Sequence, residues 1–312
     1  MRYKKIVIAL ILIVGLIFAF YVSFPFSVTQ APIVENRVAV LDLSGIIAYS
    51  ESPLTLWGET LTPDGVSKMV EQVEDDPSTK AVLLKINSPG GSAAASEEIY
   101  QMIENLAKKK TVVAYLTEYG ASGGYYIALP AKEIIANPSV LTGSVGVVNV
   151  IVNFEGLFKK LGIKAYIFKS NEFKDIGSPY RNMTNEEIEV LQSIIDSVYH
   201  QFQARVIEHR GAKLNYNEVF SGKPFTGVQA KSVGLVDDIG TFEYALNVTR
   251  KLAGLPLDTP YYVVEKPKPS LLDLLLGGTK GRLKLSYEVL LMWPLPADIE
   301  VADVIYFLKT NG

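Results

Sequence analysis

The stretch TVVAYLTEYGASGGYYIAL, residues 111–129, contains the change of pattern that decides the fold. Its first part, Thr111–Leu116, is the apolar, β-branched run typical of a buried strand. Glycines then lie on both sides of Ser122, and the following run, Tyr125–Leu129, is typical of a helix. We therefore expect a strand, a tight glycine turn and a helix in direct succession.

Strands and helices alternate on both sides of this stretch. Further strands are expected over residues 38–43, 81–86, 133–136, 145–150 and 164–169. Helices are expected from Pro63 to about residue 76, over 96–109, over 154–161, and from Thr184 to about residue 210. Glu187 lies three residues after Thr184 and completes a capping box. This alternation predicts an α/β domain with mainly parallel strands.

The pattern loosens after about residue 254. Tyr261–Val264 is a possible short strand, and residues 271–276 and 289–295 are apolar runs too short to span a membrane. These runs either cover an edge of the sheet or mediate subunit contact, and both interpretations stay open.

The N-terminus combines positive charge with an apolar run. Three of the first five residues are basic, and an uncharged segment follows from Ile6 to Val22 and continues loosely to Phe26. Residues 6–22 would span roughly 26 Å as a helix, close to the ~30 Å hydrocarbon core of a bilayer. A cleaved secretory leader is the alternative, but no clear small-residue cleavage site follows, which favours an anchor. Either way the rest of the chain faces outward.

Composition excludes several classes of function. The chain has 312 residues and a net charge of −3 without a basic block, so nothing indicates a nucleic-acid partner. It has no cysteine, which excludes disulfides, thiolate metal sites and cysteine nucleophiles. Its two histidines, His200 and His209, both fall in the long predicted helix, on a face that we expect to be mostly solvated.

Ser122 is the candidate nucleophile. At a helix N-terminus, free N–H groups and the positive end of the dipole would stabilise a developing oxyanion. The glycines allow a tight turn and close approach of a substrate. By itself, however, the local pattern favours an ordinary N-cap serine. The turn at residues 87–91, NSPGG, also follows a strand, and its paired glycines can direct N–H groups toward a ligand.

A nucleophilic serine needs a base, and the positions of the histidines disfavour a Ser-His-Asp triad. Lys174 is the candidate, with the alternative that it is an ordinary surface lysine. A lysine base must be neutral, which burial promotes, and Phe173 and Ile176 offer apolar surroundings. Asp175 must then point away from it. Ser144, between glycines at a strand edge, could orient the amine through its hydroxyl.

Three segments together resemble the signal peptide peptidase A family: NSPGGSAAASEEIY (87–100), YGASGGYYIALPAKEIIANPSVLTGSVGV (119–147) and FKSNEFKDIGSP (168–179). The resemblance implies a ClpP/crotonase-type fold of repeated ββα units. It also implies a serine endopeptidase with Ser122 as nucleophile, Lys174 as general base and Ser144 as the residue that orients the lysine. Gly123, with Gly90 or Gly91, would supply the oxyanion hole, and no cofactor or metal is expected.

The N-terminal charge and hydropathy, together with this resemblance, divide the chain into parts and suggest its cellular location. The expected parts are a cytoplasmic N-terminus (1–5), a transmembrane anchor (6–26), a linker (27–36), a protease domain (37–254) and a C-terminal extension (255–312), for which a subunit interface is one interpretation. We expect a single-pass protein of the cell membrane with its catalytic domain outside the cytoplasm. It would act on signal-peptide remnants and other apolar peptides, as a homo-oligomeric ring of eight copies whose sites are completed between neighbours.

Three alternatives remain open from the sequence. A stomatin-associated protease would share the fold and the Ser–Lys pair. A crotonase-like enzyme acting on an acyl-CoA would use the oxyanion glycines, but would leave the lysine unexplained. A catalytically silent membrane scaffold would use neither.

Overall fold

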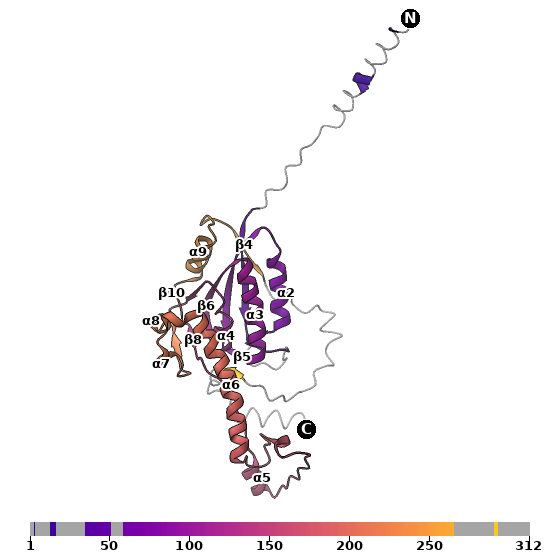
Figure 1. Cartoon of the computed structure of the whole chain (residues 1–312), viewed down its shortest axis with the longest axis vertical. Helices are drawn as coiled ribbons and strands as arrows, with labels where there is room; N and C mark the ends of the chain where they lie inside the picture. Colours follow the sequence, from indigo (N-terminus) through magenta and orange to yellow (C-terminus); the bar gives the residue numbers. More distant parts are fainter. Residues whose placement is uncertain (1–2, 4–12, 17–34, 51–58, 265–289, 293–312) are drawn as a thin grey trace. The chain divides into compact units, whose positions relative to one another are not determined.

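The computed structural model describes residues 3, 13–16, 35–50, 59–264 and 290–292 (Figure 1). Two compact units divide the chain, Met1–Glu35 and Asn36–Gly312. The anchor expected over residues 6–26 falls almost wholly outside the described residues. Within the described part, no helix is both long enough and apolar enough to cross a membrane.

The larger unit is built on a sheet of parallel strands. In the described part the order is β10 (Asp238–Ile239), β7 (Glu133–Ala136), β6 (Thr111–Ala121), β4 (Thr79–Ser88), β1 (Arg37–Ser44) and β11 (Tyr261–Val264). β8 (Leu141–Gly143) pairs with the distal part of β6, and β9 (Pro224–Thr226) pairs antiparallel with β8. The predicted α/β class with mainly parallel strands is therefore confirmed.

Helices cover both faces of this sheet. Successive residues of a strand point to opposite faces, so Ala39 and Leu41 join the larger core cluster, whereas Val38 and Val40 join the smaller one. The larger cluster includes apolar residues of α2 (Pro63–Glu74) and α3 (Ala93–Lys109), and the smaller includes those of α9 (Phe242–Leu252). The chain thus forms a three-layer domain, with α2 and α3 side by side in Figure 1.

A second, smaller sheet lies beside the first. Its order is β12 (Leu290–Met292), β5 (Gly90–Ser92), β2 (Ile46–Ile47) and β3 (Thr60–Leu61). β1 leads through β2 and β3 to α2, and β4 leads through β5 to α3. Because β1 pairs in parallel with β4 and β2 pairs in parallel with β5, these are two stacked repeats of one strand–strand–helix arrangement.

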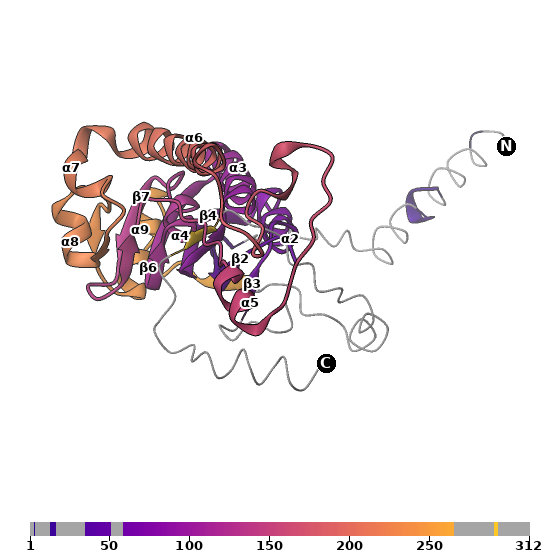
Figure 2. The ribbon, with the colours of Figure 1, turned by 90° about the horizontal axis from the view of Figure 1, so that it is seen from below.

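The long helix α6 (Asn185–Arg210) begins where the sequence predicts. Thr184 and Glu187 form the expected capping box. Only the C-terminal half of α6 packs on the body of the domain, where Phe202 and Val206 are buried and Phe202 contacts the ring of Tyr126. Figures 1 and 2 show this half of α6 beside α3.

Short elements complete the described chain: α4 (Gly123–Tyr126), α5 (Glu155–Leu161), η1 (Glu172–Asp175), η2 (Gly211–Lys213), α7 (Tyr216–Val219) and α8 (Gly227–Ser232). α5 lies near the far end of α6 in Figure 1.

Two predicted strands are wrong. Residues 145–150 and 164–169 are apolar enough for strands, but in the described structure neither forms one. Val150 is 76% exposed and Phe168 is 94% exposed, so these side chains lack the buried surface that a strand of this composition normally packs against. An apolar run predicts burial, but it does not say which surface provides it.

Candidate active site

Ser122 lies at the sharp turn between β6 and α4, as predicted. Its backbone is at φ 52° and ψ −120°, a region that residues other than glycine rarely adopt. The Ser122 N–H donates to the Gly143 carbonyl at 2.8 Å, and the Ser122 carbonyl accepts from the N–H groups of Tyr125 and Tyr126. These bonds hold a conformation that costs about 1–3 kcal/mol, a strain common at functional sites.

The Ser122 hydroxyl is buried and unpaired. The residue is 1% exposed, and its Oγ has no hydrogen-bond partner among the described residues. A buried hydroxyl normally finds a partner, because leaving it unpaired costs free energy. An N-cap serine would use its side chain to bond the first turn of the helix, and Ser122 makes no such bond. Its hydroxyl is therefore not used to cap α4.

Ser144 occupies the equivalent position on the neighbouring strand. β6 and β8 pair in parallel, with Ala121 opposite Gly143. Ser122 follows Ala121 and Ser144 follows Gly143, so the two serines come directly after paired residues. Ser144 is 6% exposed and has φ 51°. Among the described residues other than glycine, only these two serines have positive φ. The structure thus brings together two serines that lie far apart in the sequence.

The glycine turn after β4 packs directly against the turn at Ser122. A Cβ on Gly123 would lie 2.5 Å from Ser96 Oγ and 3.2 Å from Gly90 Cα, so only glycine fits at that position. A Cβ on Gly124 would lie 2.3 Å from the Ser88 carbonyl oxygen. The first N–H groups of a helix have no acceptor within it. These short distances make Gly123 a neighbour of the loop of Gly90 and Gly91. An oxyanion hole formed by N–H groups of Gly123 and of this loop would require this arrangement.

Lys174 does not reach Ser122 in the single chain. It lies in the short η1 helix, where its side chain is exposed, while Ser122 Oγ has no partner among the described residues. Asp175 is turned to other partners, as expected: it accepts from Lys169 Nζ at 2.7 Å and from two nitrogens of Arg181, each at 2.7 Å. The Arg181 and Lys169 cations hold the pKa of Asp175 well below its usual range.

Arg181 ties this lysine-bearing segment to the start of α6. Besides Asp175, it donates to both carboxylate oxygens of Glu187, at 2.8 and 2.5 Å. Glu187 also accepts from the Thr184 N–H in the capping box. The hydrogen bonds from Arg181 and from Thr184 lower the pKa of Glu187 to about 2. The sequence indicated the capping box, but not that its glutamate anchors the loop of Lys174.

The two histidines differ from each other. His200 is exposed, as expected. His209 is half-buried, so the prediction of a solvated face is wrong for this residue; its Nε2 lies 2.7 Å from the Tyr100 hydroxyl, and burial lowers its pKa. Since Ser122 Oγ is unpaired within the described residues, neither histidine acts as its hydrogen-bonded base.

A polar network next to the Ser122 turn was not predicted from the sequence. Tyr126, in the helix that follows Ser122, donates from its hydroxyl to Glu97 on α3. Arg205 on α6 donates to the same carboxylate at 3.0 Å and lies over the ring of Tyr100, 4.5 Å from its centroid. These contacts connect α4, α3 and α6. No sequence pattern indicates them, since the partners are 29 or more residues apart.

One cluster of the described residues resembles a metal site in composition. Ligand atoms of Glu104, Glu208 and His209 lie within 4.8 Å of one another. However, Glu104 pairs with Lys108 and Glu208 pairs with Arg205, so both carboxylates already have cationic partners. The cluster therefore gives no support to metal chemistry.

The chain is similar to several known proteins. A family model described as "Clp protease" matches residues 59–137, which run from β3 to β7 and include the turn at Ser122. A solved structure of a mutant "1510-N membrane-bound stomatin-specific protease" is similar over 75% of this chain and 99% of its own, at 16% identity and a TM-score of 0.46. The fold is an α/β domain, and its match to the Clp protease model is confined to the strands and helices around Ser122.

The family assignment is more specific. The model described as "Peptidase family S49" matches residues 104–256. "Putative protease MJ0651" of Methanocaldococcus jannaschii is 41% identical over 220 residues, covering 70% of this chain and 67% of its own. "Serine protease SPPA, chloroplastic" of Arabidopsis thaliana is 30% identical over 247 residues, covering 78% of this chain and 36% of its own. The chain belongs to peptidase family S49 and is a serine protease.

The role of Glu187 predicts how the Lys174 loop responds to pH. Because the pKa of Glu187 is lower in the folded state than in the unfolded state, the Glu187 carboxylate stabilises the fold fully at any pH above its unfolded pKa. This stabilisation is lost as the pH falls toward its folded pKa. We expect hydrogen-exchange protection of residues 169–183 to decline between about pH 4.5 and about pH 2. Glu187→Gln should already reduce this protection at pH 7.

The matched control is Glu189→Gln, since Glu189 is an exposed glutamate on the same helix. It should leave protection of the loop at the wild-type level. If Glu187→Gln also keeps wild-type protection at pH 7, the anchoring role assigned to Glu187 is wrong.

Proposed function

We propose that this protein is a membrane-anchored endopeptidase in which Ser122 is the nucleophile and Lys174 the general base. The observation that carries the proposal is the Ser122 turn: a strained backbone, a buried hydroxyl without a partner, and the Gly90–Gly91 loop packed against Gly123. A serine that served only to cap α4 would need none of these features.

The proposed reaction is acyl transfer to serine. Ser122 Oγ attacks the carbonyl carbon of the peptide, and its proton passes to the neutral amine of Lys174. The N–H of Gly123 and that of Gly90 or Gly91 would bind the oxyanion. Collapse of the tetrahedral intermediate breaks the C–N bond, and the leaving amine takes the proton from Lys174. Water, deprotonated by Lys174, then hydrolyses the ester and restores Ser122.

Ser144 would orient the lysine. In the proposed site its hydroxyl accepts a hydrogen bond from the amine and adds no charge that would favour the ammonium form. Its support is the parallel pairing of β6 and β8, which places Ser144 beside Ser122 at the same edge of the sheet.

Completion of the site requires that the exposed Lys174 be sheltered from water. A free lysine at pH 7 is neutral in only about 1 of 2,500 molecules, so a solvated amine is a poor base. We propose that neighbouring copies provide the shelter in a homo-oligomeric ring, with an octamer as the expected form. The site would then be completed between neighbours.

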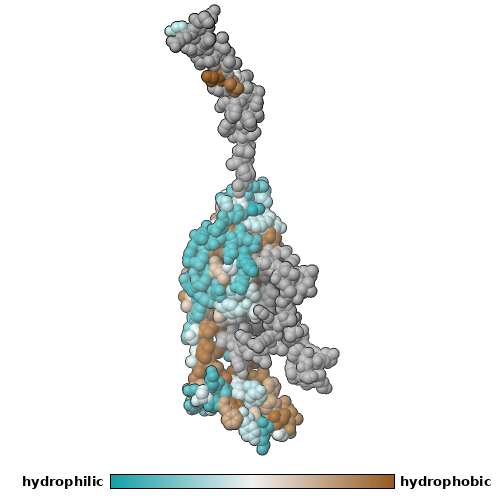
Figure 3. Space-filling view, turned by 90° about the vertical axis from the view of Figure 1, so that its right-hand side faces the viewer, coloured by the Kyte–Doolittle hydropathy of each residue, from teal (hydrophilic) through white to brown (hydrophobic). Residues whose placement is uncertain are grey.

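The apolar surface around the lysine segment supports such assembly. Tyr166 is 77% exposed and Phe168 is 94% exposed, and large apolar residues are exposed along the N-terminal half of α6 as well. In Figure 3, hydrophobic residues gather toward the lower end of the domain. Exposed apolar patches of this kind mark interaction surfaces in soluble domains.

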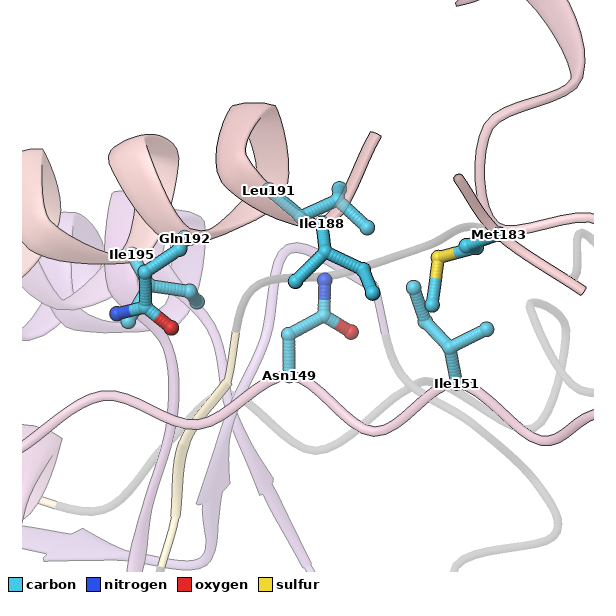
Figure 4. Close-up of a pocket in the computed structure, with 7 residues that line it drawn as sticks. All are labelled: Asn149, Ile151, Met183, Ile188, Leu191, Gln192 and Ile195. Carbon is cyan, nitrogen blue, oxygen red and sulfur yellow. The ribbon is translucent and has the colours of Figure 1, made fainter. Parts of the chain in front are cut away.

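A cavity of about 260 Å³ lies within this surface. Figure 4 shows its lining converging from two sides, with Asn149 and Ile151 from an extended segment and Ile188, Leu191, Gln192 and Ile195 from α6, together with Met183. An apolar side chain of a neighbouring copy is the occupant that the proposed ring predicts.

The substrates we propose are signal-peptide remnants and other apolar peptides near the membrane. The apolar run over residues 6–26 would anchor the chain, with a cytoplasmic N-terminus and an extracytoplasmic catalytic domain. An enzyme held at the bilayer would meet these peptides where they are released.

Substitution of the two proposed catalytic residues tests the chemistry. Ser122→Ala and Lys174→Ala should each reduce cleavage of an apolar reporter peptide by about 10⁴-fold or more, because each removes a group that acts in bond making. Lys164→Ala is the matched control, since Lys164 is another exposed lysine of the same segment, and it should retain wild-type activity. Substantial activity in either catalytic variant would refute the dyad.

Mixing the inactive variants tests whether sites form between copies. When Ser122→Ala and Lys174→Ala proteins are dissociated, mixed in equal amounts and reassembled, we expect about a quarter of wild-type activity, because a random ring pairs an intact serine with an intact lysine at about that fraction of interfaces. Each variant treated alone should stay inactive. No recovery from verified mixed oligomers would assign both residues to the same chain.

Fractionation tests the proposed anchor. The full chain should sediment with membranes and be released by detergent but not by high salt, whereas a chain that begins at Arg37 should be soluble. Protease added to cells from which the cell wall or outer membrane has been removed should degrade the catalytic domain. A soluble product with a new N-terminus shortly after residue 26 would instead indicate a cleaved leader.

A further inference from the structure

The three-residue strand β12 lies at the edge of the proposed active site. β12 pairs antiparallel with β5, with Leu290 opposite Ser92, Leu291 opposite Gly91 and Met292 opposite Gly90. β5 is the strand whose glycines pack against Gly123: a Cβ on Gly123 would lie 3.4 Å from Gly91 N. The most C-terminal part of the chain that the structure describes therefore lies beside the nucleophile turn.

Without β12, β5 would present an open edge. Its other side is occupied by β2, where Ile47 pairs with Gly91 so closely that a Cβ on Gly91 would lie 2.0 Å from the Ile47 carbonyl oxygen. An exposed strand edge offers unpaired N–H and C=O groups to any extended peptide. Strand addition of this kind is a general mode of peptide recognition, in which main-chain hydrogen bonds give affinity independent of sequence.

We propose that β12 is an internal competitor for peptide: residues 290–292 occupy the β5 edge on which a peptide must lie to present its carbonyl to Ser122. This inference rests on the proposed function, because only a peptide-cleaving site gives the occupied edge a consequence. The occupant is a segment of the chain itself, and it already pairs with β5 in a defined register. Its residues, Leu-Leu-Met, are apolar, as are the peptides proposed as substrates.

The small size of the contact makes the block reversible. Only three residue pairs join β12 to β5, so the intrinsic affinity of the segment is low. Its tether compensates, because 25 residues (265–289) link it to β11 and keep it at a high effective concentration near the edge. An incoming apolar peptide would displace β12 by competition for the same main-chain groups. The site would thus favour peptides that are abundant or that bind well.

Leu291→Pro in the full chain tests the competition. Proline removes the backbone N–H and fixes φ, which disfavours strand pairing at the centre of β12. We expect faster hydrogen exchange over residues 88–92 and an apparent KM for a short apolar reporter peptide lower by about 5- to 10-fold, with kcat unchanged. Ser270→Pro, a proline placed in the same C-terminal extension outside β12, should behave as wild type.

A synthetic peptide of residues 285–297 provides a second measurement that needs no variant. It should inhibit wild-type protein competitively, and inhibit Leu291→Pro more strongly. Exchange, KM and inhibition that are the same in Leu291→Pro and wild type would overturn the proposal. If neither protein cleaves any peptide, the proposed function fails, and the exchange rates alone decide whether β12 occupies the edge.

Discussion

The hydrogen bond from the Ser122 N–H to the Gly143 carbonyl, at 2.8 Å, is the contact on which the site depends. It fastens the end of β6 to the end of β8 at the point where β6 turns into α4. Because the pairing is parallel, the carboxyl ends of β6 and β8 lie at the same edge of the sheet. Ser122 and Ser144 become neighbours there, each with a positive φ that the surrounding bonds maintain.

The same constraint explains the glycines. β6 also pairs in parallel with β4, and Ser88 near the end of β4 lies opposite Gly120. The turn that follows β4 therefore packs against the turn that follows β6. A Cβ on Gly123 would collide with Ser96 Oγ of α3, and a Cβ on Gly124 would collide with the Ser88 carbonyl oxygen at the end of β4. The strain at Ser122 and the crowding at these glycines are two results of joining three strand ends at one edge of the sheet.

Two parts of the chain around the Ser122 turn are, in our proposals, the surfaces that bind partners. The lysine segment is fixed to α6 through Arg181, between Asp175 and Glu187, yet it exposes Lys174 and a group of apolar residues. The β5 edge, by contrast, is filled by the chain's own β12. In our proposals, a neighbouring copy covers the first part and a substrate peptide displaces the occupant of the second. In these proposals the partners act on Lys174 and on the β5 edge, and the turns around Ser122 keep the arrangement described here.

The sequence by itself determined the principal strands and helices of residues 37–136, the turn at Ser122 and the capping box at Thr184, because each depends on periodicity or on residues within a few positions of one another. It did not indicate β8, β9, β10 or α9. It wrongly predicted strands over 145–150 and 164–169, where Val150 and Phe168 are exposed on the single chain. It left open what 289–295 covers. The tertiary structure alone decided that β12 pairs with β5, that Ser144 lies beside Ser122, and that Glu97 joins Tyr126 to Arg205. These contacts join residues far apart in the chain, and strand pairing through main-chain groups places little demand on the side chains that a sequence displays.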